Sequence, residues 1–487
     1  MKESETYAGT WNVLGEDISY NGILHVFREP EFLLCLEITI PCISENQHPR
    51  FSIKGKFPFL EGRLLNGMPL LLYSCQTGQE SYHVGAFTRQ FIYAEYAFWN
   101  YTIENQESFL FASAVVDFGD ILQWADLCAF QSEVTESNKT LISWESKPDI
   151  VFSLDSQTTV TFRPILQDIP TYNRKRSLNT RQSISVTFNY SPAAPWSKIV
   201  SDINEIRYLI SLGMKTHVGI DRLFCLPIKK EPYEQKEILI GKGKNEQTVE
   251  TSRSEYLFSL KELAENDGEH LAEWCNVYPK LKPVLDLYMS SFEGHVATAE
   301  MLFLNLTQAL ETFHARFFSN DVVEYRKRIQ SLLDSIYGVD SNDVCRAQWE
   351  NLLLSRSQKK YHHILLKSRL AELFFDGGAV AMWSSEFSNI EKICYTRNYF
   401  THYDETLIDK IYSSIELPYV NTHLMSLLSY HILSLLKFEK DKARQKLKRY
   451  TADVRTMFII NEHTNRISNV HGTASPANGV VVPSDGK

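Results

Sequence analysis

The sequence predicts an α+β protein in which a β-rich, sandwich-like first half is followed by an all-helical second half. Three observations lead to this prediction. The chain of 487 residues is too long for one ordinary hydrophobic core, which indicates two large domains or three smaller ones. Short apolar runs bounded by turn residues fill the first half, whereas apolar residues recur every three or four positions in the second half.

The strands are predicted from runs of apolar and β-branched residues that recur every few tens of positions. Runs of this kind, with turn residues between them, are typical of an antiparallel sandwich or barrel. The expected strands cover residues 22–27, 32–40, 69–74, 109–118, 158–164 and 183–189. One helix is expected over residues 197–212, where four isoleucines are spaced by three or four positions.

A polar connection over residues 226–256 separates the two halves, and we expect the domain boundary soon after it, near residue 262. The sequence thus predicts an N-terminal β-rich domain over residues 1–262 and a helical domain over residues 263–450. The tail, residues 451–487, is rich in Asn, Ser, Gly and Pro, and we expect it to be largely disordered.

Helices are predicted in the second half from apolar stripes with helical spacing. The stripes are Leu302, Leu306, Leu310, Phe313 and Phe317, then Leu366, Leu370 and Leu373, then Phe387, Ile390 and Cys394, and last Leu424, Leu428, Ile432 and Leu435. Gly377 and Gly378 would end the second helix, Ser384 or Ser385 would cap the third, and Pro418 would open the last. Four or five helices over this length make an α-bundle.

The composition limits the class of function. The net charge is −9, from 50 Lys and Arg against 59 Asp and Glu, which disfavours nucleic-acid binding by bulk charge and leaves a local basic patch open. No secretion signal and no membrane-spanning stretch are expected, and eight scattered cysteines without a CxxC pair indicate reduced thiols. We therefore expect a cytoplasmic protein with no membrane partner, metal site or other cofactor.

Residues 397–404 carry the most unusual side chains of the helical half. The apolar stripe of Ile390 and Cys394 continues at the same spacing into Arg397. A guanidinium in the place of an apolar side chain is destabilising unless its charge is paired or reaches water. A local rule broken in this way marks a candidate functional site.

Three side chains of this segment form the candidate site. Asn398 and His402 are four residues apart and share a face of the helix. Arg397 and His402 lie about 7.5 Å apart along the helix axis and about 140° apart around it. Their long side chains could converge on one phosphate held across the helix, or a second copy of the helix could complete the site, and the spacing leaves both arrangements open.

This set of side chains suits RNA cleavage without a metal ion. The imidazole of His402 can take a proton from a ribose 2′-hydroxyl or give one to the leaving 5′-oxygen. Arg397 can hold the phosphate and stabilise the charge of the transition state, and Asn398 can orient either group. The alternative interpretation is that Arg397 pairs with Asp404 or Glu391 and that His402 is a partly buried helix residue.

The string Arg397-Asn398-Tyr399-Phe400-Thr401-His402, late in a helical bundle, resembles the signature of HEPN domains, which are small helical ribonuclease or nucleotide-binding domains. Other strings extend the resemblance. They are Gly9-Thr10-Trp11 and Asn21-Gly22-Ile23-Leu24 in the β-rich half, and residues 303–314 and 366–370 in the helical half. Together they resemble the ApeA family of bacterial anti-phage proteins over most of the chain.

The resemblance implies an endoribonuclease whose active site forms where two HEPN domains dimerise. It implies Arg397 and His402 as the catalytic pair, with Asn398 as the polar position that often follows the arginine. It also matches Glu311 to an acidic residue on an earlier helix, which could pair with Arg397, orient His402, or be a solvated carboxylate beside the core. By analogy with the family, the substrate is RNA, tRNA in particular, cleavage halts translation in the infected cell, and the β-rich half senses a phage-derived or other trigger.

A basic stretch follows the last predicted helix. Residues 437–449 hold seven Lys and Arg against Glu439 and Asp441, a net charge of 7 − 2 = +5. This stretch either contacts RNA, in which case binding would weaken steeply with salt, or forms a solvated helix end.

A non-catalytic function is the competing hypothesis. In it, the β-rich domain recognises a ligand and the helical bundle only dimerises. Intact RNA under triggering conditions would favour this binding module.

Overall fold

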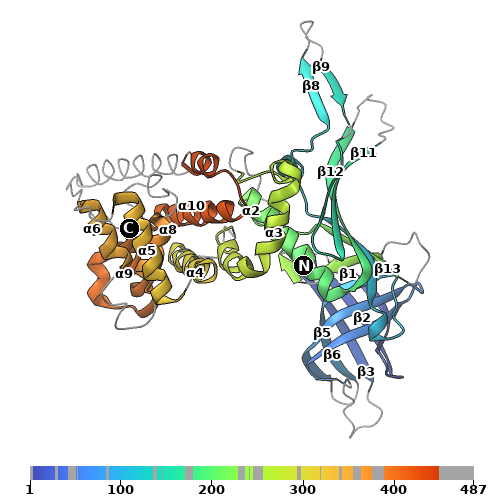
Figure 1. Ribbon diagram of the computed structural model, residues 1–487. Helices are drawn as coiled ribbons and strands as arrows, with labels where there is room; N and C mark the ends of the chain where they lie inside the picture. The colour runs from blue at the N-terminus through green and yellow to red at the C-terminus, as the bar shows by residue number, and fades with distance from the viewer. Residues whose placement is uncertain are drawn as a thin grey trace, which may run out of the picture. The chain divides into compact units, whose positions relative to one another are not determined.

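The computed structural model divides the chain into two compact units, Met1–Tyr278 and Pro279–Lys487. All described strands belong to the first unit and the second is helical, so the predicted order of a β-rich region before a helical one is confirmed (Figure 1). The boundary expected near residue 262 lies in the first turn of helix α3 (Leu260–Met289), ahead of the division after Tyr278. The described residues are 4–27, 31–41, 51, 53–83, 87–134, 140–145, 147–169, 179–228, 236–240, 242–244, 256–292, 298–318, 320–338, 343–354, 364–375 and 389–448.

Six of the described strands close into a ring of antiparallel neighbours. Each strand is hydrogen-bonded to the next, and β3 returns to β6 through pairs that run from Leu34 with Ala94 to Pro41 with Phe87. Closure of this kind removes the free edges of a sheet. In order, the ring consists of β1 (Ser4–Val13), β2 (Ser19–Phe27), β3 (Glu31–Pro41), β6 (Phe87–Trp99), β5 (Pro69–His83) and β4 (Lys56–Leu64).

Apolar side chains fill the inside of the ring. Strand β6 alternates buried and less buried positions over most of its length, as a strand with one face toward a core does. Trp11 is fully buried, and its indole Nε1 donates a hydrogen bond to the carbonyl of Gly22 at 3.3 Å. A Cβ atom at Gly62 would lie 2.3 Å from the Trp11 ring, so only glycine fits at this position.

Strand β6 continues past the ring into an open sheet. Its residues 96–98 pair with β14, and the sheet then runs through β13, β7, β12 and β11 to β10, whose outer edge pairs with no other described strand. Strands β8 (Phe130–Val134) and β9 (Thr140–Trp144) form a separate hairpin. The open sheet consists of β14 (Lys236–Ile240), β13 (Arg222–Pro227), β7 (Leu110–Asp117), β12 (Asn179–Pro195), β11 (Thr158–Ile169) and β10 (Ile150–Ser153).

Helix α2 (Trp196–Met214) packs against the open sheet. All four isoleucines of the predicted stripe are buried on this helix. Trp196, its first residue, packs edge-on against Phe98 of β6 with ring centroids 4.9 Å apart. A Cβ atom at Gly213 would lie 2.3 Å from Nε1 of Trp124 in helix α1 (Leu122–Ala125), so glycine lets this indole approach the end of α2.

The helices of the second unit enclose one apolar core. Leu306 and Leu310 of α4 (Ala299–Phe317) and Leu424 and Leu428 of α10 (Leu417–Leu435) are fully buried, as their predicted stripes require. Among the described helices, none combines the length and the apolar character that a membrane crossing requires. The remaining elements are α5 (Val322–Tyr337), α6 (Val344–Leu353), α8 (Leu366–Phe375), α9 (Ile390–His402) and the short 3-10 helix η4 (Glu405–Lys410).

The structure corrects the sequence analysis at several elements. Helices α5 and α6 were not predicted, and β14 and β15 (Lys242–Lys244) lie where a polar connection was expected. Helix α9 begins directly after Asn389, which is its N-cap. The side chain of Asn389 accepts a hydrogen bond from the backbone N–H of Lys392 at 3.0 Å. The expected caps and stops at Gly377, Gly378, Ser384 and Ser385, together with Phe387 and residues 451–487, lie outside the described residues.

Replacement of Gly62 by alanine is expected to destabilise the first unit by about 1–3 kcal/mol, the usual effect of overpacking a core. The new Cβ atom would overlap the Trp11 ring, which its hydrogen bond to Gly22 holds in place. The measurement is the midpoint of urea unfolding followed by circular dichroism. As the matched control, Gly62→Ala in a Trp11→Phe background should lower the midpoint less, because the smaller ring leaves space. An equal loss in both backgrounds would contradict this account.

Candidate active site in the helical unit

Helix α9 carries three of the predicted site residues. Its buried face consists of Ile390, Ile393 and Thr396, so Arg397 lies beside the apolar stripe and does not continue it as the sequence had suggested. The side chain of Arg397 is 29% exposed. Its charge therefore reaches water, and its position carries no large desolvation penalty.

His402 is the last residue of α9 because the next two residues end the helix. Tyr403 adopts the left-handed conformation with φ of 51°, and its N–H still donates to the carbonyl of Tyr399. The side chain of Asp404 then caps η4 by accepting from Thr406, and these hydrogen bonds, together with the nearby His402, lower the pKa of Asp404. His402 is thus an exposed side chain at a fixed helix end.

Glu311 of α4 lies opposite Arg397. The Nη2 atom of Arg397 is 3.8 Å from Oε2 of Glu311, and its Nη1 donates to Oδ1 of Asn398 at 3.3 Å. Both partners of the ion pair are 29% exposed, and pairs that are open to water contribute only about 0–1 kcal/mol. Arg397 can therefore exchange Glu311 for a phosphate at little cost in free energy.

The alternative partners of Arg397 are engaged elsewhere. Glu391 pairs with Lys367 of α8, and Asp404 caps η4. Within the part of the chain that the structure describes, neither carboxylate pairs with Arg397. The structure thus brings Arg397, Asn398 and Glu311 together, while His402 stands apart at the end of the same helix and makes no hydrogen bond with the described residues.

A buried polar network that was not predicted from the sequence adjoins Glu311. The carboxylate of Glu372 on α8 accepts from Nε2 of His314 at 2.7 Å and from Nε and Nη2 of Arg328 at 2.9 and 3.0 Å. Nη1 of Arg369 donates to Oδ1 of Asn320 at 2.8 Å and lies 3.1 Å from Nδ1 of His314. A guanidinium can only donate, so Nδ1 of His314 accepts and the neutral ring carries its proton on Nε2.

The pKa values within this network follow from burial and from the neighbouring charges. Burial lowers the pKa of His314, and the guanidiniums of Arg369 and Arg328 act in the same direction against Glu372. Burial alone would raise the pKa of Glu372, but the hydrogen bonds from His314 and Arg328 outweigh it and lower this pKa. Burial lowers the pKa of Arg369, and the negative charge of Glu311 opposes that shift. Glu311 therefore lies within electrostatic reach of two guanidiniums, Arg369 and Arg397.

A sequence signal for this network exists in two polar pairs that interrupt apolar stripes. Glu311 and His314 are three residues apart on α4, beside the buried stripe of that helix. Arg369 and Glu372 have the same spacing on α8, and each directly precedes a buried leucine, Leu370 and Leu373. Spacing of this kind places each pair on one helix face, and a buried charge requires a partner on another helix.

Within the described residues, we find neither a metal site nor a reactive cysteine beside these side chains. No cluster of His, Cys, Asp and Glu within the described ranges is arranged to hold a metal ion. Burial raises the pKa of the Cys394 thiol to about 12, which leaves it protonated and poorly nucleophilic.

The basic stretch is partly neutralised by its own carboxylates. Arg444 pairs with Asp441 and Lys442 pairs with Glu439, both at 2.8 Å. Arg449 lies outside the described residues. Contact between this stretch and RNA stays a hypothesis.

The stability of the helical unit is expected to fall as the pH is lowered from about 7.5 to about 5. The pKa of His314 in the folded chain lies below its ordinary value of 6.5. The unfolded chain therefore binds the proton first, and stability is lost as the pH falls from that value through the folded pKa. The measurement is the thermal midpoint across this pH range.

His314→Gln is the diagnostic variant, because it keeps an N–H donor for Glu372 and cannot titrate. Its thermal midpoint should depend less steeply on pH than that of the wild type, whereas His83→Gln, which replaces an exposed histidine of the first unit, should leave the profile unchanged. Parallel profiles for the wild type and His314→Gln would show that another group titrates.

The comparison with protein families covers both units. The model of ApeA N-terminal domain 1 matches residues 6–274, and the model of the Apea-like HEPN domain matches residues 304–442. No curated protein and no solved structure matches the chain. The HEPN match contains Glu311, Arg397, Asn398 and His402, and the family points to an anti-phage nuclease of the HEPN type. With more than half of its length matched by the first model alone, the chain belongs to the ApeA family and joins an ApeA N-terminal domain to an ApeA-like HEPN domain.

Proposed function

We propose that this chain is a metal-independent endoribonuclease that acts in the bacterial cytoplasm as an abortive-infection defence and cleaves RNA, tRNA in particular. The helical HEPN-type unit is the nuclease, and the β-rich unit senses a phage-derived or other trigger or restrains the nuclease. The observation that carries the proposal is the water-exposed pair of Arg397 and His402 on one helix of a HEPN-type unit. Arg397 has a weak, exchangeable partner in Glu311, as a phosphate-binding group requires.

In the proposed reaction, the ribose supplies the nucleophile. His402 takes the proton of the 2′-hydroxyl, the 2′-oxygen forms a bond to phosphorus, and the bond from phosphorus to the 5′-oxygen breaks. The guanidinium of Arg397 leaves Glu311 and stabilises the extra negative charge on the phosphorane oxygens. The 5′-oxygen departs with a proton from an imidazolium, and the other product ends in a 2′,3′-cyclic phosphate.

A homodimer follows from what this reaction needs. One proton must be removed and another delivered on opposite sides of the phosphorus, and a single imidazole at one helix end does not reach both. Within one chain, Arg397 and His402 are about 140° apart around the helix. His402 of the partner subunit would supply the missing group if two α9 helices meet at the RNA.

Arg397→Ala and His402→Ala are each expected to reduce RNA cleavage by about 10²–10⁴-fold, the usual contribution of a proton-transfer or charge-stabilising group. His402 is exposed and Arg397 is partly exposed with only a weak ion pair, so the thermal midpoint should stay close to the wild-type value. RNA-end sequencing from cells that express each variant measures cleavage, and loss of toxicity accompanies it. Lys410→Ala, which removes an exposed charge just beyond the site, is the matched control and should cleave normally. Wild-type rates in either site variant would refute the assignment.

Cleavage is also expected to persist in EDTA, because an imidazole and a guanidinium supply the proton transfers and the charge stabilisation. Mass spectrometry of a short RNA substrate should show 2′,3′-cyclic phosphate ends. If EDTA stops cleavage and added Mg²⁺ or Zn²⁺ restores it, the chemistry belongs to a metal ion.

A further inference from the structure

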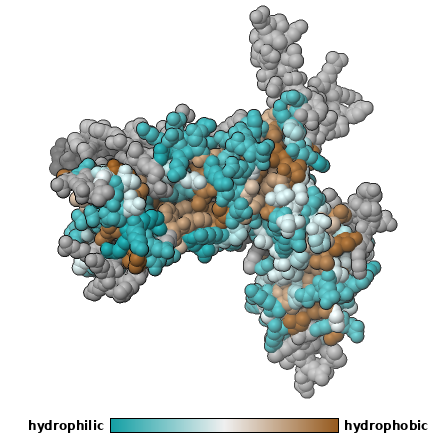
Figure 2. All heavy atoms as spheres, in the orientation of Figure 1, coloured by the Kyte–Doolittle hydropathy of each residue, from teal (hydrophilic) through white to brown (hydrophobic). Residues whose placement is uncertain are grey.

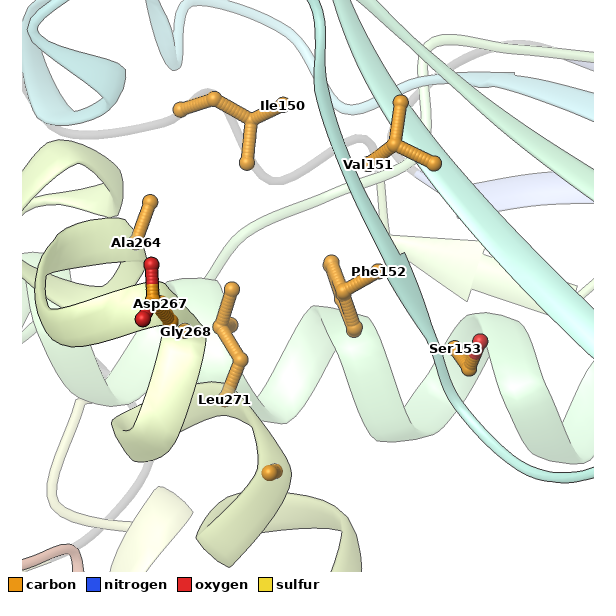
Figure 3. Close-up of a pocket in the computed structure, with 9 residues that line it drawn as sticks. Ile150, Val151, Phe152, Ser153, Ala264, Asp267, Gly268 and Leu271 are labelled. Atoms are coloured by element: carbon orange, nitrogen blue, oxygen red, sulfur yellow. The ribbon is translucent and has the colours of Figure 1, made fainter.

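The first unit contains a groove between strand β10 and helix α3. It has a volume of about 370 Å³, within the range of ligand sites in proteins. Figure 3 shows Ile150, Val151 and Phe152 of β10 on one side and Ala264 and Leu271 of α3 on the other. The walls are therefore mostly apolar, and neither the proposed catalytic residues nor the helical unit contribute to them.

The strand that forms one wall has an unpaired edge. Strand β10 ends the sheet and pairs with β11 alone among the described strands. The carbonyl of Ser153 accepts a weak hydrogen bond from Sγ of Cys275 on α3, so it points away from β11. Backbone groups alternate in direction along an antiparallel strand, and the N–H and C=O of Val151 therefore point the same way. Among the described residues neither group has a strand partner, so they present one donor and one acceptor at the groove.

A break in α3 shapes the opposite wall. Asn266, Asp267 and Gly268 have φ values of 52°, 57° and 76°, a left-handed run that Asn, Asp and Gly tolerate better than other residues. This run interrupts the helix and brings the exposed side chain of Asp267 to the lip of the groove. Residues 262–273 contain five acidic residues and no Lys or Arg, so the field at this lip is negative.

The other end of the groove is also acidic. Beyond Ser153, the carboxylates of Asp155 and Asp202 share one cation, Lys198, at 2.6 and 2.9 Å. Burial and the charge of Asp202 raise the pKa of Glu205 to about 8, so this third carboxyl group is largely neutral at neutral pH, and the two aspartates against Lys198 leave one net negative charge. Asp155 acts electrostatically on Cys275, which contacts Ser153. A ligand in this groove would therefore meet apolar walls along its length and negative potential at both ends.

We propose that the groove binds an extended segment of another protein that pairs with β10, places apolar side chains between β10 and α3, and carries Lys or Arg at its two ends. An extended polypeptide fits because its own C=O and N–H can pair with the N–H and C=O of Val151, whereas a compact ligand would leave both groups of Val151 without partners. Basic ends fit because both ends of the groove are acidic. The proposal concerns binding by the first unit alone and does not depend on the nuclease activity of the second.

The test uses the full chain and fluorescein-labelled pools of short peptides. In the main pool, Val, Ile or Phe alternate with Thr and lysines stand at both ends, and in the comparison pool glutamates replace the lysines. A third pool carries N-methyl groups on the central backbone amides. Fluorescence anisotropy should show saturable binding of the lysine pool that weakens with salt, and at least about tenfold weaker binding of both other pools.

Two variants of the groove are expected to weaken binding. Val151→Pro removes the outward N–H and should raise the Kd of the lysine pool about tenfold. Asp267→Asn removes the charge, keeps a residue that tolerates the left-handed backbone, and should raise the Kd about fivefold. Asp120→Asn, which removes an exposed charge of the same unit outside the groove, is the matched control and should bind as the wild type does.

Four results would overturn the proposal. Equal binding of the lysine and glutamate pools, or no binding of either, removes the charge argument. Equal binding of the N-methylated pool removes strand pairing, and this result stands even if Val151→Pro fails to fold. Unchanged affinity in Asp267→Asn places the binding site elsewhere.

Discussion

The arrangement of the helical unit depends on one buried carboxylate. Glu372 of α8 accepts hydrogen bonds from His314 of α4 and from Nε and Nη2 of Arg328 of α5, so a single side chain connects three helices. Apolar packing alone permits a helix to rotate, whereas a buried charge requires its partners at fixed positions. The same contacts reach the site, because His314 is hydrogen-bonded to Arg369, and Glu311 lies within the field of both Arg369 and Arg397. The proposed phosphate-binding arginine is therefore connected, through Glu311 and Arg369, to the buried network around Glu372.

The parts of the fold that local spacing encodes were predictable. Every isoleucine of the α2 stripe is buried, because helical periodicity is a property of neighbouring residues. Helix α5 has a comparable stripe in Tyr325, Ile329 and Leu333, but three consecutive basic residues follow Tyr325 and obscure the apolar pattern. Strand β14 was missed for a different reason. It pairs with the preceding strand β13 and with β6, where Ile238 lies beside Phe98. Pairing with a strand as distant in the sequence as β6 leaves little trace in the residues of β14 itself.

At the site, too, the sequence predicted what depends on neighbouring residues and missed contacts between residues far apart in the chain. Arg397, Asn398 and His402 stand close together in the sequence, and their spacing and family resemblance identified them. The resemblance also indicated Glu311, but only the packing of α4 on α9 shows that Glu311 faces Arg397. Polar residues beside the apolar stripes mark His314 and Glu372 separately, but 58 residues separate them, so the sequence does not show that they pair with each other. The helix spacing nevertheless excluded a direct contact between Arg397 and His402, and the described structure contains none.

Strand β6 belongs to two sheets at once. Its early residues close the ring with β3, and its last residues pair with β14 of the open sheet, where Phe98 meets Trp196 of α2. The ring and the open sheet thus share one continuous piece of backbone. A gene fusion or domain exchange with its junction inside residues 87–99 leaves neither part complete, so the two must be inherited as a single module. A domain built this way diversifies through its loops and edge strands, since its ring and its open sheet cannot be recombined independently.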